Sequence, residues 1–375
     1  MKYLLWLLRI IVGVLFIFSG LVKANDPLGL TYKMEEFFEV LHMTFFNQYA
    51  FAFSILMIAF EIISGVALLL GYAFRIFSFL LLLLNLWFTF LTAYALFSGK
   101  IKECGCFGDC IKISNEETFW KDVVLTIMSI ILFIYRKRVE PVIKGRAGHI
   151  VMLIVTIFAF GIQWWSLKHL PFHDCLPYKK HANVYRKMLP PPGCVPDSFA
   201  NIFIYQKDGV KKEFTQDNLP WQDTTWVFVD RIDKMVRKGN CDPEIKDFII
   251  SDENGNDRTV EILNTPGPTY LWFVKDAATA NTANMDDLKS LIANAQKQNI
   301  PFYVLCSSVK EEAEAFRKKH GLEHVPFYVL DGTVSKTAMR SNPGLMLLDQ
   351  GTIVEKWSYM DYPKDAQMVN NQPAH

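Results

Sequence analysis

The sequence has almost no net charge, and its second half contains no dense run of basic residues. Lysine and arginine together number 39, aspartate and glutamate 38, and the formal net charge is +1 at pH 7. A protein that binds nucleic acid needs a basic patch or stripe to neutralise the phosphates. Nucleic acid is therefore not expected among its partners.

Charged residues are also scarce within the long apolar runs, which lie almost entirely in residues 1–166. Residues 167–375 have the composition of ordinary soluble protein, although the whole chain is 51% hydrophobic and 21% charged. This segregation predicts a domain embedded in a lipid bilayer, followed by one or two soluble domains.

Five runs are long enough to cross about 30 Å of hydrocarbon at about 1.5 Å per residue. They lie at residues 4–22, 50–71, 74–98, 119–135 and 148–166. A cleaved signal peptide is the alternative for the first run. Its apolar core would be shorter and would end in a small-residue cleavage motif, which is missing before Lys23. We therefore expect an uncleaved first span.

The loop at 136–146 carries the densest cluster of cations in the membrane half: Arg136, Lys137, Arg138, Lys144 and Arg146. Such cations are enriched in cytoplasmic loops. Alternation of five spans then puts the N-terminus in the cytoplasm, and the 98–118 loop and everything after 167 outside it. The predicted location is the inner membrane of a bacterium, with the C-terminal half in an oxidising compartment where disulfides persist.

Arg9 lies within the first apolar run, and Glu61 lies near the middle of the second. A charge at such a depth is costly unless it is paired or faces the bundle interior. In one interpretation an Arg9–Glu61 ion pair holds two helices together. In the other, Arg9 extends to the cytoplasmic surface and Glu61 stays neutral.

Three of the seven cysteines fall within seven residues after the third run, in the stretch Cys104-Gly105-Cys106-Phe107-Gly108-Asp109-Cys110. Exchange needs an accessible thiolate, a resolving thiol and a disulfide of modest stability. A Cys104–Cys106 disulfide closes a small ring, so it should be easily reduced. Cys110 is close enough in sequence to act as the resolving or alternative partner. These three cysteines are the candidate redox residues.

Two structural interpretations compete with redox exchange in this cluster. One is a static disulfide that pins the loop, and the other is a metal site. Zinc usually takes four ligands, and the 98–118 loop contains no histidine. No metal is therefore expected.

The first 136 residues resemble known membrane proteins. The opening resembles that of the DoxX family, and the residues that carry this likeness are Arg9, Gly13, Phe18-Ser19-Gly20-Leu21-Val22-Lys23, Asp26-Pro27, Glu61, Gly65 and Gly71. The Cys104-Gly105-Cys106-Phe107-Gly108 stretch resembles the MauE branch of that group, four-helix proteins associated with methylamine utilisation and redox maturation. The resemblance implies thiol–disulfide handling outside the cytoplasm, in a layout similar to quinone-linked membrane proteins. A membrane quinone would suit that role, but the sequence identifies no electron acceptor.

Residues 167–242 form a junction between the last span and the C-terminal domain. Asp208-Gly209 lies between two short apolar runs and predicts a hairpin turn. Cys175 and Cys194 bracket a proline-rich segment, and either form a disulfide with each other or remain thiols.

From residue 243 the pattern changes to alternating strands and helices. Strands are expected at 248–250, 270–274, 302–305, 327–330, 345–348 and 352–357, and helices at 285–298 and 309–320. This order predicts an α/β domain with a mixed sheet.

The same order resembles the TlpA-like branch of the thioredoxin fold. Ser341-Asn342-Pro343-Gly344 matches the place of that fold's cis-proline, so Pro343 is the expected site of a cis bond and of partner binding. The active dithiol is missing, because no cysteine occurs between Cys241 and Cys306. Cys306 ends an apolar strand and is expected to be an inert core thiol.

The predicted fold is therefore a five-span α-helical transmembrane bundle, a four-helix DoxX/MauE-like core plus one span, with a C-terminal extracytoplasmic α/β domain. The domains are a membrane domain at 1–146, a fifth span at 147–166, the junction at 167–242 and a thioredoxin-like domain without a dithiol at 243–375. One hypothesis is a thiol–disulfide relay that acts on an extracytoplasmic protein partner. The alternative is a non-enzymatic scaffold with a static disulfide and a partner-binding soluble domain.

Overall fold

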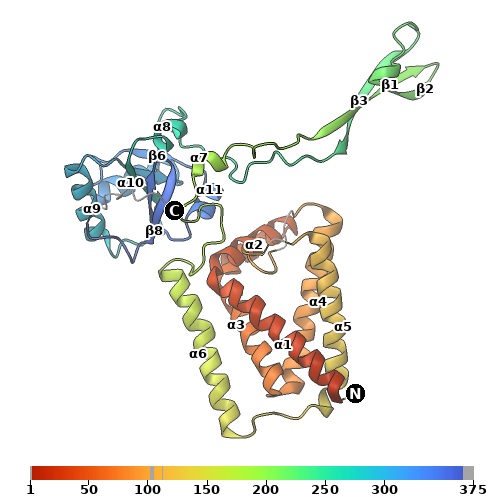
Figure 1. Cartoon of the computed structure of the whole chain (residues 1–375), viewed down its shortest axis with the longest axis vertical. Coiled ribbons are helices and arrows are strands. Elements are labelled where there is room, and N and C mark those ends of the chain that lie inside the picture. Colours follow the sequence, from red (N-terminus) through yellow and green to blue (C-terminus); the bar gives the residue numbers. More distant parts are fainter. Residues whose placement is uncertain (1, 102–104, 112, 366–375) are drawn as a thin grey trace.

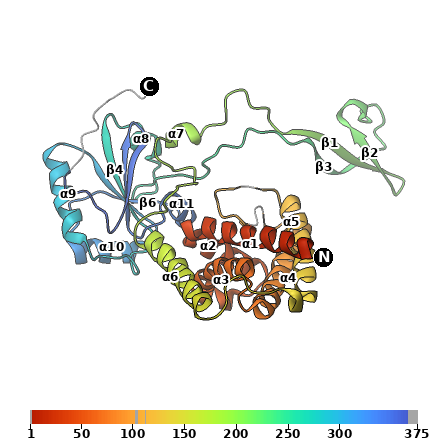
Figure 2. The same cartoon turned by 60° about the horizontal axis from the view of Figure 1, so that its bottom comes forward.

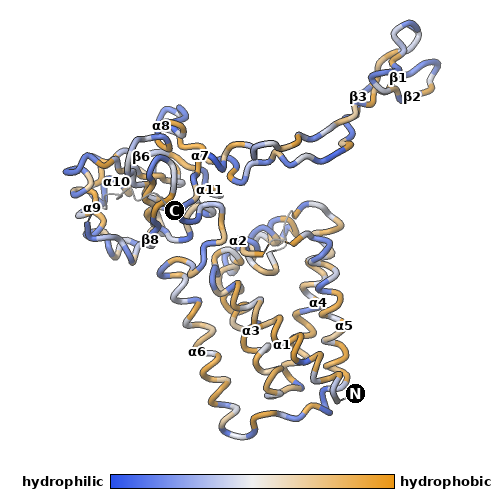
Figure 3. Tube along the Cα trace, viewed as in Figure 1, coloured by the Kyte–Doolittle hydropathy of each residue, from blue (hydrophilic) through white to orange (hydrophobic). Residues whose placement is uncertain are grey.

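The computed structural model describes residues 2–101, 105–111 and 113–365. It consists of a helical bundle, a sheet domain beside one end of that bundle, and a narrow three-stranded sheet that projects away from both (Figures 1 and 2). Apolar residues dominate the long helices, whereas polar residues are interspersed throughout the rest of the chain (Figure 3).

Four helices in the described part of the chain are long and apolar enough to cross a membrane. They are α1 (Lys2–Asn25), α3 (Ala50–Leu70), α4 (Phe74–Ser98) and α6 (Arg146–Lys168). A further helix, α5 (Asn115–Ile134), lies beside α4 (Figure 1). Its first turns carry Glu116, Glu117, Lys121 and Asp122, which set it apart from the other four.

Short polar side chains hold α5 against α4 inside the bundle. Asn85 Nδ2 donates to Ser129 Oγ at 2.7 Å, and the hydroxyls of Thr89 and Thr126 lie 2.8 Å apart. In hydrocarbon there is no water to satisfy such groups, so helices that share them are held together. The 119–135 run is thus a helix of the bundle.

Helices α1 and α3 cross closely at a point where two glycines face each other. A Cβ on Gly65 would lie 2.8 Å from the carbonyl oxygen of Gly13, and one on Gly13 would lie 3.0 Å from that of Gly65. Only residues without a side chain let two backbones approach this closely.

Arg9 and Glu61 do not pair with each other. Arg9 is buried and donates to the carbonyl oxygens of Leu68 and Leu69, each at 2.6 Å. These carbonyls belong to the last turn of α3, which has unsatisfied acceptors and the negative end of the helix dipole. Arg9 therefore caps a neighbouring helix. Of the two interpretations, the Arg9–Glu61 ion pair is wrong, because Arg9 is bonded to these carbonyls and Glu61 to Lys23.

Two short helices follow α1 at the end of the bundle that faces the sheet domain. They are α2 (Pro27–Val40) and the 3₁₀ helix η1 (Thr44–Tyr49). Asp26 caps α2 by accepting a hydrogen bond from the Gly29 amide, and Pro27 occupies the first turn, where no amide donor is needed. At the opposite end, the short helix η2 (Arg136–Arg138) begins the cationic connection to α6.

The C-terminal domain is built on a five-stranded mixed sheet in the order β6-β5-β4-β7-β8. Its strands are β4 (Pro268–Val274), β5 (Phe302–Cys306), β6 (Phe327–Val329), β7 (Gly344–Asp349) and β8 (Thr352–Ser358). Strand β5 is parallel to both β4 and β6, whereas β7 is antiparallel to both β4 and β8. Strand β4 is central, and its apolar run is buried on both faces.

Helices α9 (Met285–Lys297) and α10 (Lys310–His320) cover one face of the sheet. The predicted face of α9 is confirmed, because Leu288, Leu291, Ile292 and Ala295 are buried there. The other face is covered by the short helices α7 (Val184–Lys187), α8 (Thr259–Leu263) and α11 (Gly332–Ala338). Tyr178 and Val184 are buried in this second core, so part of the junction packs into the sheet domain.

One predicted strand of this domain is absent from the described secondary structure. Residues 248–250 are non-regular chain in which Phe248 and Ile250 are buried and Ile249 is exposed, and the adjoining Ser251 forms only isolated bridges, to Asp257 and to Val329. The apolar run therefore signalled the burial of two side chains rather than strand pairing, an ambiguity common to short apolar runs.

The projecting sheet has the order β2-β1-β3 and is antiparallel throughout. It consists of β1 (Ser198–Lys207), β2 (Val210–Thr215), the helical turn η3 (Gln216–Asn218) and β3 (Val227–Arg237). The predicted hairpin is confirmed, because Lys207 pairs with Val210, and both Asp208 and Gly209 have positive φ.

Both alternatives for Cys175 and Cys194, a disulfide with each other or two thiols, are wrong. Cys194 is bonded to Cys241 at the base of the projecting sheet, and Cys175 is bonded to Cys110 in the loop after α4. The Cys194–Cys241 bond joins the chain entering this sheet to the chain leaving it. Sequence spacing cannot reveal such pairings, because they depend on which segments meet in space.

The glycine contact between α1 and α3 leads to a prediction about stability. Replacing Gly65 with Ala should destabilise the bundle by roughly 1–3 kcal/mol, the usual range for overpacking. Gly161 of α6 is the matched control, because a Cβ there meets nothing within 4 Å. Gly161→Ala should leave the thermal midpoint in detergent unchanged or slightly higher. Equal midpoints for the two variants would contradict the close crossing.

Candidate functional site

The described part of the cysteine loop lies against the end of the bundle that faces the sheet domain. Gly105 and Gly108 both have positive φ, and the Gly108 amide donates to the Gly105 carbonyl at 2.9 Å. This left-handed backbone favours glycine, since a side chain would be strained there. The tight turn brings Cys106 toward the helices. Cys104 lies outside the described residues.

A buried ion pair lies directly beneath Cys106. Lys23 Nζ of α1 is 2.6 Å from Glu61 Oε1 of α3, and the two side chains are 3% and 0% exposed. Ser19 Oγ lies 2.9 Å from Glu61 Oε2 and 3.2 Å from the carbonyl oxygen of Cys106, so its single proton is shared between them. The ion pair is therefore connected to the backbone of the cysteine loop through one hydroxyl.

The sulfur of Cys106 faces a second buried carboxylate. Its Sγ is 3.9 Å from Oδ2 of Asp122 in α5, and the other oxygen of Asp122 is 2.8 Å from Lys121 Nζ. Phe107 covers this pair, with Lys121 Nζ 4.8 Å from the centre of its ring. A carboxylate at this position can accept the thiol proton, while the lysine limits the build-up of negative charge.

A cavity of about 490 Å³ extends from this polar cluster between α1, α2, α3 and α4. Lys23, Lys33, Thr92, Gly105 and Cys106 form its polar wall. The remaining walls are apolar and consist of Leu30, Met34, Phe37, Phe38, Leu41, Met43, Phe46, Phe53, Leu56, Met57, Phe60, Leu84, Trp87, Phe88 and Leu91. A volume of several hundred Å³ with few polar groups is typical of small-molecule sites.

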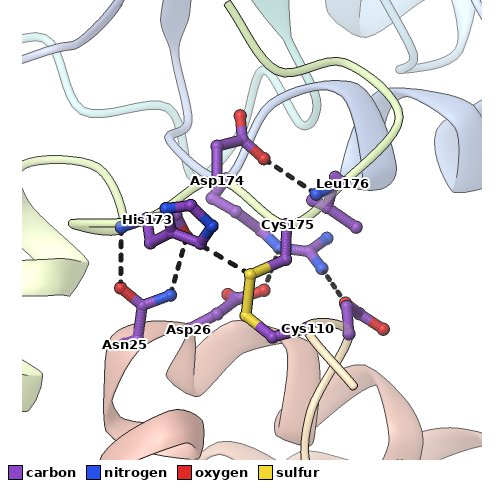
Figure 4. The surroundings of a disulfide bond; sticks show 9 residues. Asn25, Asp26, Cys110, His173, Asp174, Cys175 and Leu176 are labelled. Carbon is purple, nitrogen blue, oxygen red and sulfur yellow. Dashed lines mark hydrogen bonds and ion pairs between the residues drawn. A yellow bond between two sulfur atoms is a disulfide. The ribbon is translucent and has the colours of Figure 1, made fainter. Parts of the chain in front are cut away.

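The sequence indicated that Cys110 would pair with a neighbouring cysteine of the loop, but its disulfide partner comes from a distant segment. Cys110 is bonded to Cys175, which follows α6, so the disulfide ties the cysteine loop to the chain that enters the sheet domain (Figure 4). Asn25 at the end of α1 reinforces the tie. Its amide group donates to the His173 carbonyl at 2.8 Å and accepts from the His173 amide at 3.0 Å.

Arg340 makes the main ionic contact between the bundle and the sheet domain. It lies between α11 and β7, is 8% exposed, and donates to Asp26 and to Asp109, each at 2.7 Å. Burial alone would lower the pKa of Arg340, but the two carboxylates outweigh it and the pKa is raised. One guanidinium thus joins the start of α2, the cysteine loop and the sheet domain.

Lys275 lies beside this contact, immediately after β4. Its Nζ is 3.0 Å from the Arg340 carbonyl and 3.4 Å from the Tyr32 hydroxyl of α2. The pKa of Lys275 is lowered to about 7, mainly by burial and also by the nearby Arg340, while Asp26 partly opposes the shift. Lys336 of α11 also faces Glu35 of α2 at 3.5 Å.

The remaining predicted residues lie within the sheet domain. The Asn342–Pro343 bond is cis, as predicted, and the Asn342 carboxamide accepts a hydrogen bond from the Lys275 amide at 3.0 Å. Cys306 is buried, as expected for a core thiol, and burial raises its pKa. Pro343 therefore lies in the loop that Arg340 anchors to the bundle.

Several residues of this site were not singled out as site residues from the sequence. Lys23 and Asp26 belong to the DoxX-like opening, so that pattern was their signal. Asp109 lies within the cysteine stretch. Asp122 and Arg340 have no local signal, because each matters only through contacts with distant segments.

The Arg340 contact can be tested by substitution. Arg340→Met should lower stability by an amount near the lower end of roughly 3–5 kcal/mol, because it removes the buried cationic partner of Asp26 and Asp109, while both carboxylates keep some solvent contact. Hydrogen exchange should rise in α2 and near Asp109. Arg258→Met is the control, since its pair with Glu261 is exposed and should contribute at most about 1 kcal/mol. Unchanged exchange in α2 would contradict the bridging role.

The lowered pKa of Lys275 predicts a pH dependence. Between pH 7 and about 10.5 the unfolded chain binds more protons at this lysine than the folded one, so stability rises with pH. The stability of the wild type relative to Lys275→Met should thus increase from pH 7 to pH 9 and be flat well below the folded-state pKa of about 7. Thermal midpoints measure this, with Lys297→Met, on the exposed end of α9, as the charge control. The prediction would be contradicted if the thermal midpoint of Lys275→Met rose relative to that of the wild type as the pH increased.

Comparison with known proteins distinguishes two regions of the chain. Residues 199–238, the projecting sheet, match a domain of unknown function, DUF8463. No curated protein and no solved structure matches the chain. Residues 1–135 match the family model described as methylamine utilisation protein MauE. The region from α1 to α5, including the cysteine loop and the Lys23–Glu61 pair, is therefore a MauE-like membrane domain.

Proposed function

We propose that this protein is a membrane-bound thiol–disulfide relay or maturation protein that acts on the extracytoplasmic side. Cys104 and Cys106 exchange electrons with a thiol or disulfide of a protein partner. The observation that carries the proposal is the surroundings of Cys106: its sulfur faces Asp122, its carbonyl is held by Ser19, and it lines an apolar cavity.

The exchange follows ordinary thiol–disulfide chemistry. In the oxidising direction, a client thiolate attacks one sulfur of the Cys104–Cys106 disulfide, forming a mixed disulfide and releasing the other sulfur as a thiolate. The second client thiol then attacks the mixed disulfide, so the client leaves oxidised and Cys104 and Cys106 are reduced. Asp122 is placed to accept and return the proton of Cys106.

The Cys110–Cys175 disulfide takes Cys110 out of the role of resolving thiol for its neighbours. In the proposal it holds the cysteine loop in position, so that the exchanging pair is Cys104 with Cys106. The loop and the sheet domain meet at one end of the bundle, which supports their placement on the same side of the membrane.

The proposed topology has five spans, with α5 as the fourth, the N-terminus in the cytoplasm and the sheet domain outside. The membrane is the inner membrane of a bacterium. The cations of residues 136–146 lie at the end of the bundle opposite the sheet domain, which supports this orientation. The paired cysteines on the other side fit an oxidising compartment.

The sheet domain is proposed to be thioredoxin-like and to lack a dithiol. The strand order β5-β4-β7-β8, with β4 parallel to β5 and antiparallel to β7, supports this, together with the cis bond before Pro343. The loop that contains Pro343 also contains Arg340, and the ion pair of Arg340 with Asp109 connects it to the cysteine loop. The domain would include residues from about 170, because Tyr178 and Val184 contribute to its core.

A scaffold without exchange chemistry is the second candidate. The two disulfides and the buried Arg340 contact favour it, since they fix loops and domains relative to one another. Partner binding would then depend on the soluble domains alone, and the Cys104–Cys106 pair would be dispensable.

Trapping of mixed disulfides in cells separates the two candidates. Cys104→Ser should accumulate a client bonded to Cys106, because no resolving thiol remains, and this adduct should disappear with reductant and in the Cys104→Ser/Cys106→Ser double variant. Cys306→Ser is the control, since that thiol is buried in the sheet domain. Absence of any adduct in both Cys104→Ser and Cys106→Ser would exclude the relay and leave the scaffold.

A further inference from the structure

Strand β3 of the projecting sheet has a long outer edge that is open to a partner. It is the last strand in the order β2-β1-β3, so it pairs with β1 on one side and with no described strand on the other. All eleven of its residues are exposed, and none is a proline or a glycine. Such an edge presents unpaired N–H and C=O groups, and proteins usually shorten, cover or break it. An uncovered edge of this length indicates a strand partner.

The base of the projecting sheet is held together, so the edge is presented as a preformed strand. Cys194 and Cys241 are bonded there. The Val195 amide donates to Asn240 Oδ1 at 2.7 Å, and the Asn240 amide donates to the Val195 carbonyl oxygen at 2.9 Å. The sheet projects away from the bundle and from the sheet domain (Figures 1 and 2). Another chain can therefore reach β3 with little ordering cost.

The middle of β3 carries charges of opposite sign that are placed symmetrically about Ile232. Asp230 and Lys234 lie on either side of it, on the same face of the strand. Arg231 and Asp233 flank it directly on the other face, where Arg231 Nε is 2.6 Å from Asp233 Oδ1. When two β3 strands pair antiparallel about Ile232, Asp230 of one copy lies opposite Lys234 of the other. Arg231 likewise lies opposite Asp233.

Neighbouring registers bring like charges together. The N–H and C=O groups of a strand point alternately to its two sides, so an antiparallel copy can move only in steps that keep this alternation. One step in either direction places Arg231 opposite Arg231, or Asp233 opposite Asp233. Like charges directly opposite each other are destabilising, whereas opposite charges and apolar pairs are favourable. The charge pattern therefore selects the register centred on Ile232, in which Val229 also lies opposite Met235.

We propose that β3 pairs with β3 of a second copy of this chain, in the antiparallel register centred on Ile232. The two three-stranded sheets then form one continuous sheet, with a two-fold axis through the Ile232 pair. One strand pair is a small interface, but confinement of both copies to a membrane raises their local concentration. The contact is separate from the cysteine loop and does not depend on the proposed exchange function.

Cysteine cross-linking tests the contact with the full-length chain in isolated membranes. Ile232→Cys places one added thiol per chain at the symmetry axis, so oxidation with copper phenanthroline should give a disulfide-linked dimer on a non-reducing gel. Glu213→Cys is the matched control, because Glu213 of β2 is also exposed and lies on the same face at the opposite edge. The wild type gives the background from its own cysteines. Equal dimer from both variants, or none from Ile232→Cys, would overturn the proposal.

Charge reversal tests the register. Chains with two different affinity tags are expressed together and captured in mild detergent through one tag. When both chains carry Asp230→Lys, recovery of the second tag should fall at least about tenfold, because two unlike pairs become like pairs. Asp230→Lys expressed with Lys234→Asp should restore recovery, since each chain then matches the other. Glu213→Lys, at the opposite edge, should leave it unchanged.

The rescue also separates a lost contact from a misfolded chain. Both partners of the rescued pair carry a substitution, so recovery shows that each variant still folds. Equal recovery for Asp230→Lys with itself and with Lys234→Asp would overturn the register and with it the proposal. If the amides of β3 are protected from hydrogen exchange in membranes although Ile232→Cys gives no dimer, a strand of another protein occupies the edge and the proposal is wrong.

Discussion

The buried pair of Lys23 and Glu61 is the interaction on which the cysteine site depends. It joins α1 to α3 inside an apolar bundle, where a charge without a partner would be energetically costly. Ser19 extends the pair to the backbone of Cys106, so the position of the loop is set from inside the bundle. The close Gly13–Gly65 crossing brings the two helices near enough for the pair to form.

A second set of contacts acts on the same loop from outside. The Cys110–Cys175 disulfide and the Arg340–Asp109 ion pair connect it to the sheet domain, while Asp26 gives Arg340 a second partner at the start of α2. The loop is therefore held between two domains. The sheet domain, which has no dithiol of its own, thus contributes Arg340 to the surroundings of the cysteine loop in the bundle. The segment that leads into the sheet domain contributes Cys175.

Elements with a regular hydrophobic period were visible in the sequence, and those without one were not. The apolar face of α9 and the buried run of β4 follow from residue spacing alone. Helix α11 has a weak apolar pattern, and its start is marked mainly by the Asp331 cap. Residues 248–250 had the composition of a strand, but Phe248 and Ile250 are buried without strand pairing, because burial needs only an apolar surface whereas a strand needs a neighbour.

The sequence by itself determined the division into an apolar and a polar half, the cysteine cluster after the third apolar run and the turn at Asp208-Gly209, because each depends on local composition or backbone preference. The cis bond before Pro343 was expected from the resemblance of the strand and helix order to a known fold. The tertiary structure alone decided that Cys110 pairs with Cys175, that Glu61 pairs with Lys23, and that Arg340 meets Asp26 and Asp109. These pairings join residues distant in sequence. The crossing of α1 and α3 brings Lys23 to Glu61, and the return of α6 brings Cys175 and the sheet domain to the end of the bundle where the cysteine loop lies.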